Sequence, residues 1–429
     1  MLTGCDDQPV NSPYSHFKPD QATLYASFSE RPKTLDPSQS YSSNEYLFLQ
    51  QIYDPALTYS YLQRPFKLVP NTLTQLPKEI YLDENFKPIS TTDQKVAYTR
   101  YEFELQKGIK FQPHPAFAKK ADQSYWYYPI SEQQLDDLDI ETLADLKHLS
   151  TRELLASDYV YQIKRLADPY YSSPIASLMA EHIVGFKKLS KALQSARQSK
   201  QWLDLRAFDM AGLKIVDDHH YHITIRGRYP QFSYWLAMPF FAPIPWEAER
   251  FYQQAGFADR NISLSWYPVG TGAFYLAENN PNRRMLLKKN PNYREVYYPT
   301  EGMPGDAEKG YLKYAGKRLP MYEQILFSLE KESIPRWNKF LQGYYDFSGV
   351  SNDSFDQAIA VTKSGKPILT PSMKDKKIRL TSSVQPSIFY MGFNMLDDVV
   401  GGHSKANTKL RQAISIAINY EEYISIFLN

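Results

Sequence analysis

The sequence contains almost no cysteine. Cys5 is the single cysteine among 429 residues, so no disulfide can form within the chain. The folded state must then be stabilised by burial of apolar surface rather than by cross-links. The sequence also lacks a run of 18 apolar residues, which is about the length that a helix needs to cross a bilayer. We therefore expect no membrane-spanning segment.

Net charge is nearly absent as well. The 49 Lys and Arg residues and the 47 Asp and Glu residues leave a formal charge of +2. No basic footprint for nucleic acid results, and we expect no nucleic-acid partner. The sequence contains no Gly-x-Ser-x-Gly, His-Glu-x-x-His or Cys/His constellation that would mark a nucleophile and its base. We expect no catalytic residue and no cofactor.

Three histidines stand close together near the middle of the chain. His220 and His222 are two residues apart and share one face of a predicted strand over 216–226, with His219 beside them. A metal ion would need a third ligand at suitable spacing, and none appears. We therefore predict no metal site.

Aromatic residues, by contrast, are abundant. The 34 Tyr, 23 Phe and 6 Trp make up 15% of the chain. They fit Tyr-rich strand surfaces, and they also fit a cleft lined with amphipathic rings that bind varied ligands through contact area. Both interpretations can hold together in a chain whose length predicts two or three domains.

The stretch from Trp266 to Tyr293 has the clearest local pattern. Gly270 and Gly272 follow Pro268, where we expect positive φ angles and a tight passage of the backbone. Strands over 274–278 and 284–289, separated by Asn/Pro turn chemistry, predict a hairpin. The glycines lack the Lys-Ser/Thr of a phosphate loop and enter a strand rather than a helix, which excludes a nucleotide site of that kind.

This succession, Pro268 to Gly272, a hairpin and Asn290-Pro291-x-Tyr293, resembles the extracytoplasmic solute-binding proteins of the peptide/opine/nickel ABC importers, family 5. Further blocks extend the resemblance from about Leu24 to the last residue. They are Leu24–Phe28 with the turn at Arg31–Pro37, the helix over 44–57, Arg165-Leu166-Ala167-Asp168-Pro169, Ser387–Met395, and the helices over 407–427 with Asn419 as the cap of the second.

The resemblance implies an α/β fold with two lobes, the type II periplasmic-binding-protein fold of the large three-domain class. We expect residues 1–20 to be a lipobox and tether, 21–60 with 205–322 the first lobe, 61–204 a small inserted domain, and 323–429 an incomplete second lobe. In the family more residues follow, including a Trp-x-x-Asp type motif whose aspartate binds a peptide's α-amino group. The resemblance therefore implies that the C-terminal part is missing.

The implied function is capture of peptides outside the inner membrane and their delivery to the permease and ATPase subunits of an ABC importer. A nickel chelate, an opine or a glycan remains open as the ligand, because side-chain pockets differ among relatives. The rival from another class is an extracytoplasmic hydrolase. Intact ligand released on mild denaturation would favour a binding protein, whereas cleavage products would favour the enzyme.

The resemblance places ligand contacts on two segments. Ser29, Glu30 and Arg31 follow the first strand, and Tyr390, Phe393 and Asn394 belong to a crossing between the lobes. An asparagine side chain can donate and accept, as a peptide unit requires. The alternative for Asn394 is a cap at a strand end. Tyr390 and Phe393 alternate with Met391, and the pattern leaves open which set faces the cleft.

Leu2-Thr3-Gly4-Cys5 resembles the lipobox of a bacterial lipoprotein, in which lipid is attached to the cysteine sulfur. A polar run from Asp6 to Asp20 follows it, as a tether would. Asp6 resembles a signal that retains lipoproteins at the inner membrane, so we expect a periplasmic, lipid-anchored protein. No basic and apolar leader precedes the cysteine, from which we expect that Met1 is not the natural start or that the signal is lost.

Overall fold

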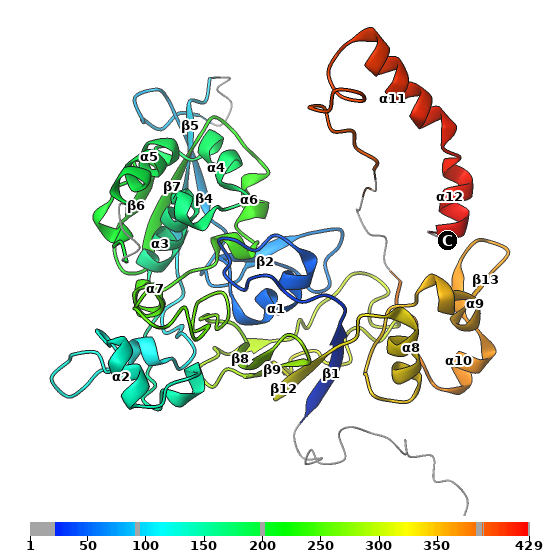
Figure 1. Cartoon of the computed structure of the whole chain (residues 1–429), viewed down its shortest axis with the longest axis horizontal. Coiled ribbons are helices and arrows are strands. Elements are labelled where there is room, and N and C mark those ends of the chain that lie inside the picture. Colours follow the sequence, from blue (N-terminus) through cyan, green and yellow to red (C-terminus); the bar gives the residue numbers. More distant parts are fainter. Residues whose placement is uncertain (1–21, 91–94, 198–201, 383–387, 389, 428–429) are drawn as a thin grey trace, which may run out of the picture. The chain divides into compact units, whose positions relative to one another are not determined.

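The chain divides into two compact units, Asn11–Lys331 and a second that contains Glu332–Asn429. In this computed structural model, the described residues are 22–90, 95–197, 202–382, 388 and 390–427. Figure 1 shows a mixed α/β fold. No helix in these ranges is long and apolar enough to cross a membrane.

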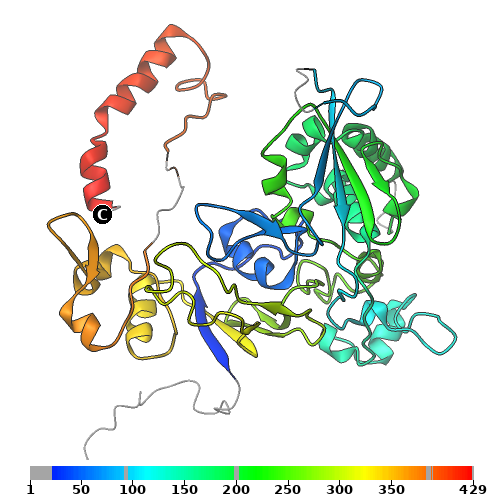
Figure 2. The ribbon, with the colours of Figure 1, turned by 180° about the vertical axis from the view of Figure 1, so that it is seen from behind.

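One four-stranded sheet joins the two ends of the first unit. Its order is β1 (Thr23–Phe28), β12 (Gln324–Leu329), β9 (Arg284–Lys289) and β8 (Phe274–Asn280). β1 runs parallel to β12, with Ala26 opposite Phe327, and β12 runs antiparallel to β9. Figure 2 shows these strands from behind. The first lobe was predicted to end at residue 322. β12 begins two residues later, at Gln324, and pairs with β1 and β9 of the first unit.

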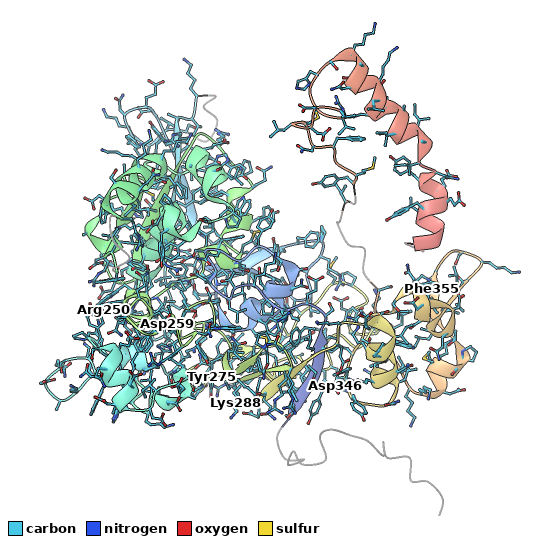
Figure 3. The ribbon with its side chains drawn as sticks, viewed as in Figure 1. Arg250, Asp259, Tyr275, Lys288, Asp346 and Phe355 are labelled. Carbon is cyan, nitrogen blue, oxygen red and sulfur yellow. The ribbon has the colours of Figure 1, made fainter. Side chains whose placement is uncertain are left out.

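Helix α1 (Ser43–Ile52) packs against this sheet through aromatic contacts. The ring of Phe48 lies 5.6 Å from that of Phe28 on β1 and 4.9 Å from that of Phe327 on β12, with both pairs edge to face. On the other face of the sheet, the half-buried Tyr275 of β8 lies opposite the exposed Lys288 of β9 (Figure 3). The sheet therefore has a buried face under α1.

The predicted hairpin is confirmed, because β8 and β9 pair antiparallel. The prediction of positive φ angles at Gly270 and Gly272 is wrong, because neither residue has one. A β-carbon at Gly270 would overlap the carbonyl oxygen of Ile52, and one at Gly272 would lie 2.5 Å from the Ile52 carbonyl carbon. The glycines are required because this passage touches the last turn of α1, whose Ile52 carbonyl accepts the Gly272 N–H at 2.8 Å.

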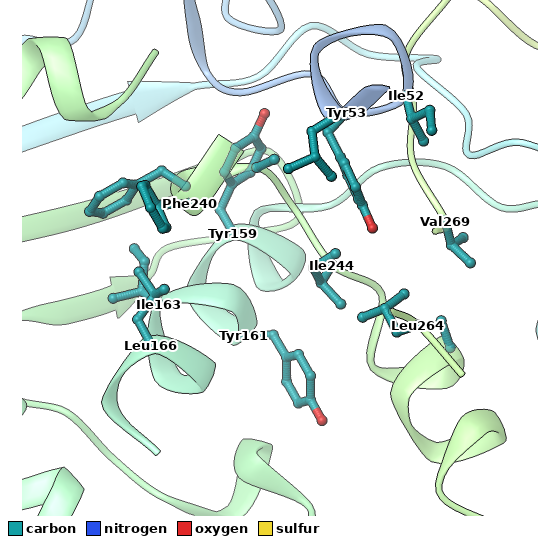
Figure 4. Close-up of a cluster of buried hydrophobic side chains, with 14 of the residues drawn as sticks. Ile52, Tyr53, Tyr159, Tyr161, Ile163, Leu166, Phe240, Ile244, Leu264 and Val269 are labelled. Atoms are coloured by element: carbon teal, nitrogen blue, oxygen red, sulfur yellow. The ribbon is translucent and has the colours of Figure 1, made fainter. Parts of the chain in front are cut away.

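A second, antiparallel sheet has the order β4 (Lys78–Leu82), β5 (Tyr98–Glu104), β7 (His220–Arg226) and β6 (Leu213–Ile215). Buried and half-buried residues alternate along β5, with Thr99, Tyr101 and Phe103 buried. Helix α3 (Ala156–Ala167) packs on this sheet, where the rings of Tyr159 and Tyr221 stack at 5.3 Å. Figure 4 shows Tyr159, Ile163 and Leu166 of this helix among other buried side chains.

Shorter elements complete the first unit. They are β2 (Leu57–Tyr59), β3 (Leu68–Pro70), η1 (Pro115–Phe117), α2 (Glu132–Asp137), η2 (Leu143–Asp145), η3 (Pro169–Tyr171), α4 (Ala176–His182), α5 (Phe186–Ala196), η4 (Leu205–Ala207), α6 (Phe232–Trp235), η5 (Pro239–Phe241), α7 (Trp246–Tyr252), β10 (Val296–Tyr297) and β11 (Arg318–Leu319). One continuous core runs through this unit, from Ala26 to Phe327.

The second unit has a much smaller core, formed by Trp337, Ala358, Ile359 and Met373. Its elements are α8 (Ser333–Leu341), η6 (Asn352–Ser354), α9 (Phe355–Ala358), β13 (Ile359–Val361), β14 (Pro367–Leu369), α10 (Pro371–Asp375), α11 (Lys405–Ala417) and α12 (Tyr420–Phe427). The predicted cap of α12 is confirmed, since Asn419 Oδ1 accepts the Glu422 N–H at 3.1 Å. α11 contains no buried residue.

Candidate functional site

Ser29, Glu30 and Arg31 line an open pocket of about 680 Å³ in the first unit. The pocket lies beyond the end of β1, where these three consecutive residues line one wall. Its other walls come from distant parts of the chain, with Trp266 from the segment before Gly270, Asn282 from the hairpin turn, and Lys331 from the segment after β12. We call this hollow the β1-end pocket.

Two side-chain hydrogen bonds hold the predicted residues in place. Arg31 donates from Nη1 to Asn282 Oδ1 at 2.6 Å, which ties the pocket to the β8–β9 turn. Glu30 accepts from Asn44 Nδ2 at 2.7 Å, which ties it to the first turn of α1. Both side chains are exposed at the surface of the pocket. They can therefore exchange these partners for a ligand.

A buried carboxylate, that of Glu45, shapes the loop that follows the pocket. It accepts the Lys33 N–H at 3.1 Å on Oε1, and the N–H groups of Tyr41 and Ser42 at 3.0 Å on Oε2. With Ser42 it forms a capping box at the start of α1. Burial alone would raise the pKa of Glu45, but the hydrogen bonds from Ser42, Ser40 and Tyr41 lower it below its usual value. The carboxylate stays ionised and fixes the loop.

The same loop is anchored to the interior by a buried ion triad. Arg165 on α3 donates to Asp36 from Nη2 to Oδ2 at 2.6 Å, and to Glu249 on α7 from Nε to Oε2 at 3.1 Å. All three side chains are at most 4% exposed. Burial would raise the pKa of Asp36, but the Arg165 guanidinium holds it below its usual value. The Arg165–Asp36 ion pair thus joins the turn at Arg31–Pro37 to the Arg165–Pro169 block at the end of α3.

The other predicted ligand residues lie in the second unit. Tyr390 is 86% exposed, Phe393 is half-buried and Asn394 is exposed. Asn394 Oδ1 accepts the Leu396 N–H at 3.1 Å, a local turn contact of the kind weighed as its alternative role. Their meeting with Ser29, Glu30 and Arg31 stays a prediction. Cys5 and the predicted tether lie outside the described residues.

The β1-end pocket carries an excess of cationic side chains. Three cationic side chains, Arg31, Lys33 and Lys331, and one carboxylate, Glu30, line it. This balance favours a ligand with negative charge at this end. In the described ranges, no group of three His, Cys, Asp or Glu residues is placed to hold a metal ion.

The three clustered histidines each face a different carboxylate. His219 Nε2 lies 3.2 Å from Glu153, His220 Nδ1 lies 2.8 Å from Asp217, and His222 Nε2 lies 3.8 Å from Glu102. Each imidazole ring therefore has its own carboxylate neighbour, and the clustering of the three histidines needs no common metal ion to explain it.

Several residues of the site were missed by sequence reasoning. Trp266 and Lys331 reach the β1-end pocket from far along the chain, and no local pattern announces such a meeting. Glu45 could have been found, because Ser42-x-x-Glu45 before an apolar run is a capping-box signature. Arg165 lay within a recognised block, but the pattern did not reveal its partners.

Known proteins resemble this chain over part of its length. The model of "Bacterial extracellular solute-binding proteins, family 5 Middle" matches residues 142–429. The periplasmic oligopeptide-binding protein OppA of Salmonella typhimurium is 27% identical over 59% of this chain and 44% of that protein. The probable deoxycholate-binding periplasmic protein YgiS of Escherichia coli is 28% identical over 46% of this chain and 35% of that protein.

The chain spans less than half of the length of these curated relatives. Among solved structures, the match to OppA of Listeria monocytogenes bound to peptide covers 81% of this chain and 54% of the OppA chain, with 13% identity and a TM-score of 0.49. The family is one of extracytoplasmic solute-binding proteins and not of enzymes. The match extends over well more than half of the residues, and the chain belongs to the family 5 bacterial extracellular solute-binding proteins.

Proposed function

We propose that the protein captures peptides outside the inner membrane and delivers them to the permease of an ABC importer. The observation that carries the proposal is the β1-end pocket, where Ser29–Arg31 lies beside Trp266 and Lys331 in a chain of this family. The name of the relative OppA, an oligopeptide-binding protein, supports the ligand class. The arrangement in two lobes, 21–60 with 205–322 and 323 onward, is part of the proposal.

A receptor for many peptide sequences must bind what all peptides share, which is the main chain. Strand-like hydrogen bonds to the main chain give affinity, while roomy wet pockets accept varied side chains. In the proposed complex, Ser29–Arg31 binds one edge of the peptide and Asn394 pairs with a peptide unit on the other edge. The cations Arg31, Lys33 and Lys331 then favour a peptide carboxylate near the first edge.

The test is calorimetry with three peptides of unrelated sequence, one of them acidic. Asn394→Ala should weaken all three about equally, by roughly 1–3 kcal/mol if its hydrogen bonds are buried in the complex. Arg31→Ala should weaken the acidic peptide most. Lys188→Ala, an exposed change on α5 far along the chain from the pocket, serves as the control.

Failure to bind any of the three peptides would overturn the proposed function. Loss for only one peptide in Asn394→Ala would contradict main-chain recognition by this residue. Displacement of bound peptide by deoxycholate would instead indicate a shared site for the ligand that the name of YgiS gives.

We include lipidation of Cys5 in the proposed function. The Leu2–Cys5 block resembles a lipobox, and Asp6 resembles the inner-membrane retention signal. Two or more acyl chains hold a protein stably at a membrane, whereas one chain anchors it only marginally. Metabolic labelling with a fatty acid should mark the protein expressed with its leader. Equal labelling of Cys5→Ser would show that the lipid is attached elsewhere.

A further inference from the structure

A second hollow in the first unit, also of about 680 Å³, shares no lining residue with the β1-end pocket. Its walls come from the end of α1, from β2 and β3, and from the segment 293–299, and α1 and β2 lie side by side in both ribbon views (Figures 1 and 2). We call it the tyrosine pocket, after Tyr46, Tyr53, Tyr59, Tyr61, Tyr293 and Tyr297. Its volume lies in the range of small-molecule sites.

The charged groups of the tyrosine pocket are already paired. Arg294 forms an ion pair with Asp54, and their side chains are only 11% and 12% exposed. Arg294 Nη2 also donates to the Asn71 carbonyl at 3.2 Å. At the rim, Glu295 lies 3.5 Å from Arg318. A charged ligand would have to break one of these pairs and leave its partner without a counter-charge, which is costly when the pair is buried.

Three of the six rings, those of Tyr46, Tyr61 and Tyr297, are exposed, and stacking on a neighbouring ring orients two of the six. Tyr61 is 66% exposed and stacks on Tyr298, with ring centroids 6.0 Å apart at 19°. Tyr59 stacks on Tyr234 at 6.4 Å and 26°. A tyrosine hydroxyl has an ordinary pKa of about 10 and therefore stays protonated at neutral pH. Each of the exposed rings offers an apolar face and a neutral hydroxyl that can donate and accept a hydrogen bond.

We propose that the tyrosine pocket binds a neutral carbohydrate of one or two sugar rings. The C–H face of a pyranose is flat and apolar and can cover a tyrosine ring, while its hydroxyls can bond to tyrosine hydroxyls and to the side-chain amides of Gln50 and Gln51. An apolar ligand would strip water from these polar groups without replacing the hydrogen bonds. A zwitterionic amino acid would bring two charges that find no free counter-charge there.

The test is calorimetric titration of the protein with maltose and with N,N′-diacetylchitobiose. We expect saturable binding of at least one of them, with an affinity that does not change between low and high NaCl because no net charge is involved. Tyr61→Ala should weaken it about tenfold, which is about 1.4 kcal/mol. Tyr322→Ala is the matched control, since that ring is also exposed, at 42%, and does not line this pocket.

Three results would overturn the proposal. The first is the absence of saturable heat with both sugars, the second is an unchanged affinity in Tyr61→Ala, and the third is competition between sugar and peptide. A saturating peptide is added in a second titration. Unchanged sugar affinity supports a separate site, whereas competition would place both ligands in one site and contradict it. Because peptide binding is measured independently, failure of the sugar site leaves the proposed function untouched.

Discussion

Arg165 is the residue on which the buried charges of the first unit depend. Its change to Leu would leave the carboxylates of Asp36 and Glu249 buried without their cation. We expect the free energy of unfolding of this unit to fall by about 3–5 kcal/mol, measured by urea denaturation. Lys289→Met removes an exposed ion pair with Glu323 and should cost at most about 1 kcal/mol. Equal losses in the two variants would contradict the role of burial.

Glu249 predicts a pH dependence of stability. Burial raises the pKa of this carboxyl to about 7, although Arg165 acts in the opposite direction. Because the folded pKa exceeds the ordinary value of 4.5, the folded state binds the proton more tightly than the unfolded state does. Its contribution to stability is full below about pH 4.5 and is lost as the pH rises through 7.

The free energy of unfolding of Glu249→Gln should therefore compare best with that of the wild type near pH 7 and above, where the wild type buries an ionised carboxylate. Urea denaturation at a series of pH values from 4.5 to 8 measures the difference in unfolding free energy. Glu181→Gln, an exposed change, should give a profile parallel to that of the wild type. A Glu249→Gln profile parallel to the wild type would show that this carboxyl does not titrate in the window.

At the scale of elements, the contact between α1 and the Gly270–Gly272 passage has no room for a side chain. Gly270→Ala would drive a methyl group into the Ile52 carbonyl, and one of the two segments must shift. We expect a loss of about 1–3 kcal/mol in unfolding free energy, as for overpacking in a core. Gly349→Ala is the control, because its β-carbon meets open space and its φ is not positive. A loss of similar size there would argue against a steric cause.

Elements defined by neighbouring residues were predictable from sequence, and long-range contacts were not. The β8–β9 hairpin and the Asn419 cap follow from turn and capping chemistry within a few residues. Gly270 was assigned to a φ requirement, whereas its real constraint comes from Ile52, more than two hundred positions away. The pairing of β1 with β12 and the Asp36–Arg165–Glu249 triad likewise had no local signal.

The candidate site shows the same limit. Ser29, Glu30 and Arg31 were placed by resemblance, because the segment after the first strand has a characteristic turn. The abundance of tyrosine suggested a ring-lined cleft, but composition could not say which rings gather. Tyr61 and Tyr297 meet only because β2 and the segment after β9 adjoin in the fold.

The two units of the molecule have hydrophobic cores of very different size. The first has one continuous core. Among its described residues the second has a core cluster of only four, Trp337, Ala358, Ile359 and Met373, and it exposes Ile416, Tyr420 and Ile424 on its last two helices by 50–83%. Limited proteolysis should therefore cut first after residue 332, and a dye for exposed apolar surface should bind the protein strongly. Mass spectrometry would identify the cuts. A single sharp unfolding transition of all 429 residues would contradict this expectation.

The parallel pairing of β1 with β12 has a consequence for the time course of synthesis. Thr23 and its partner Gln324 are 301 residues apart in the chain. A ribosome adds about 5–20 residues per second, so β1 leaves it roughly 15–60 s before β12 exists. During that interval the first strand of the nascent chain has no mate, while the β4–β5–β7–β6 sheet can already assemble. Anything that shields an apolar strand until translation passes Leu329 should raise the yield of correctly folded protein.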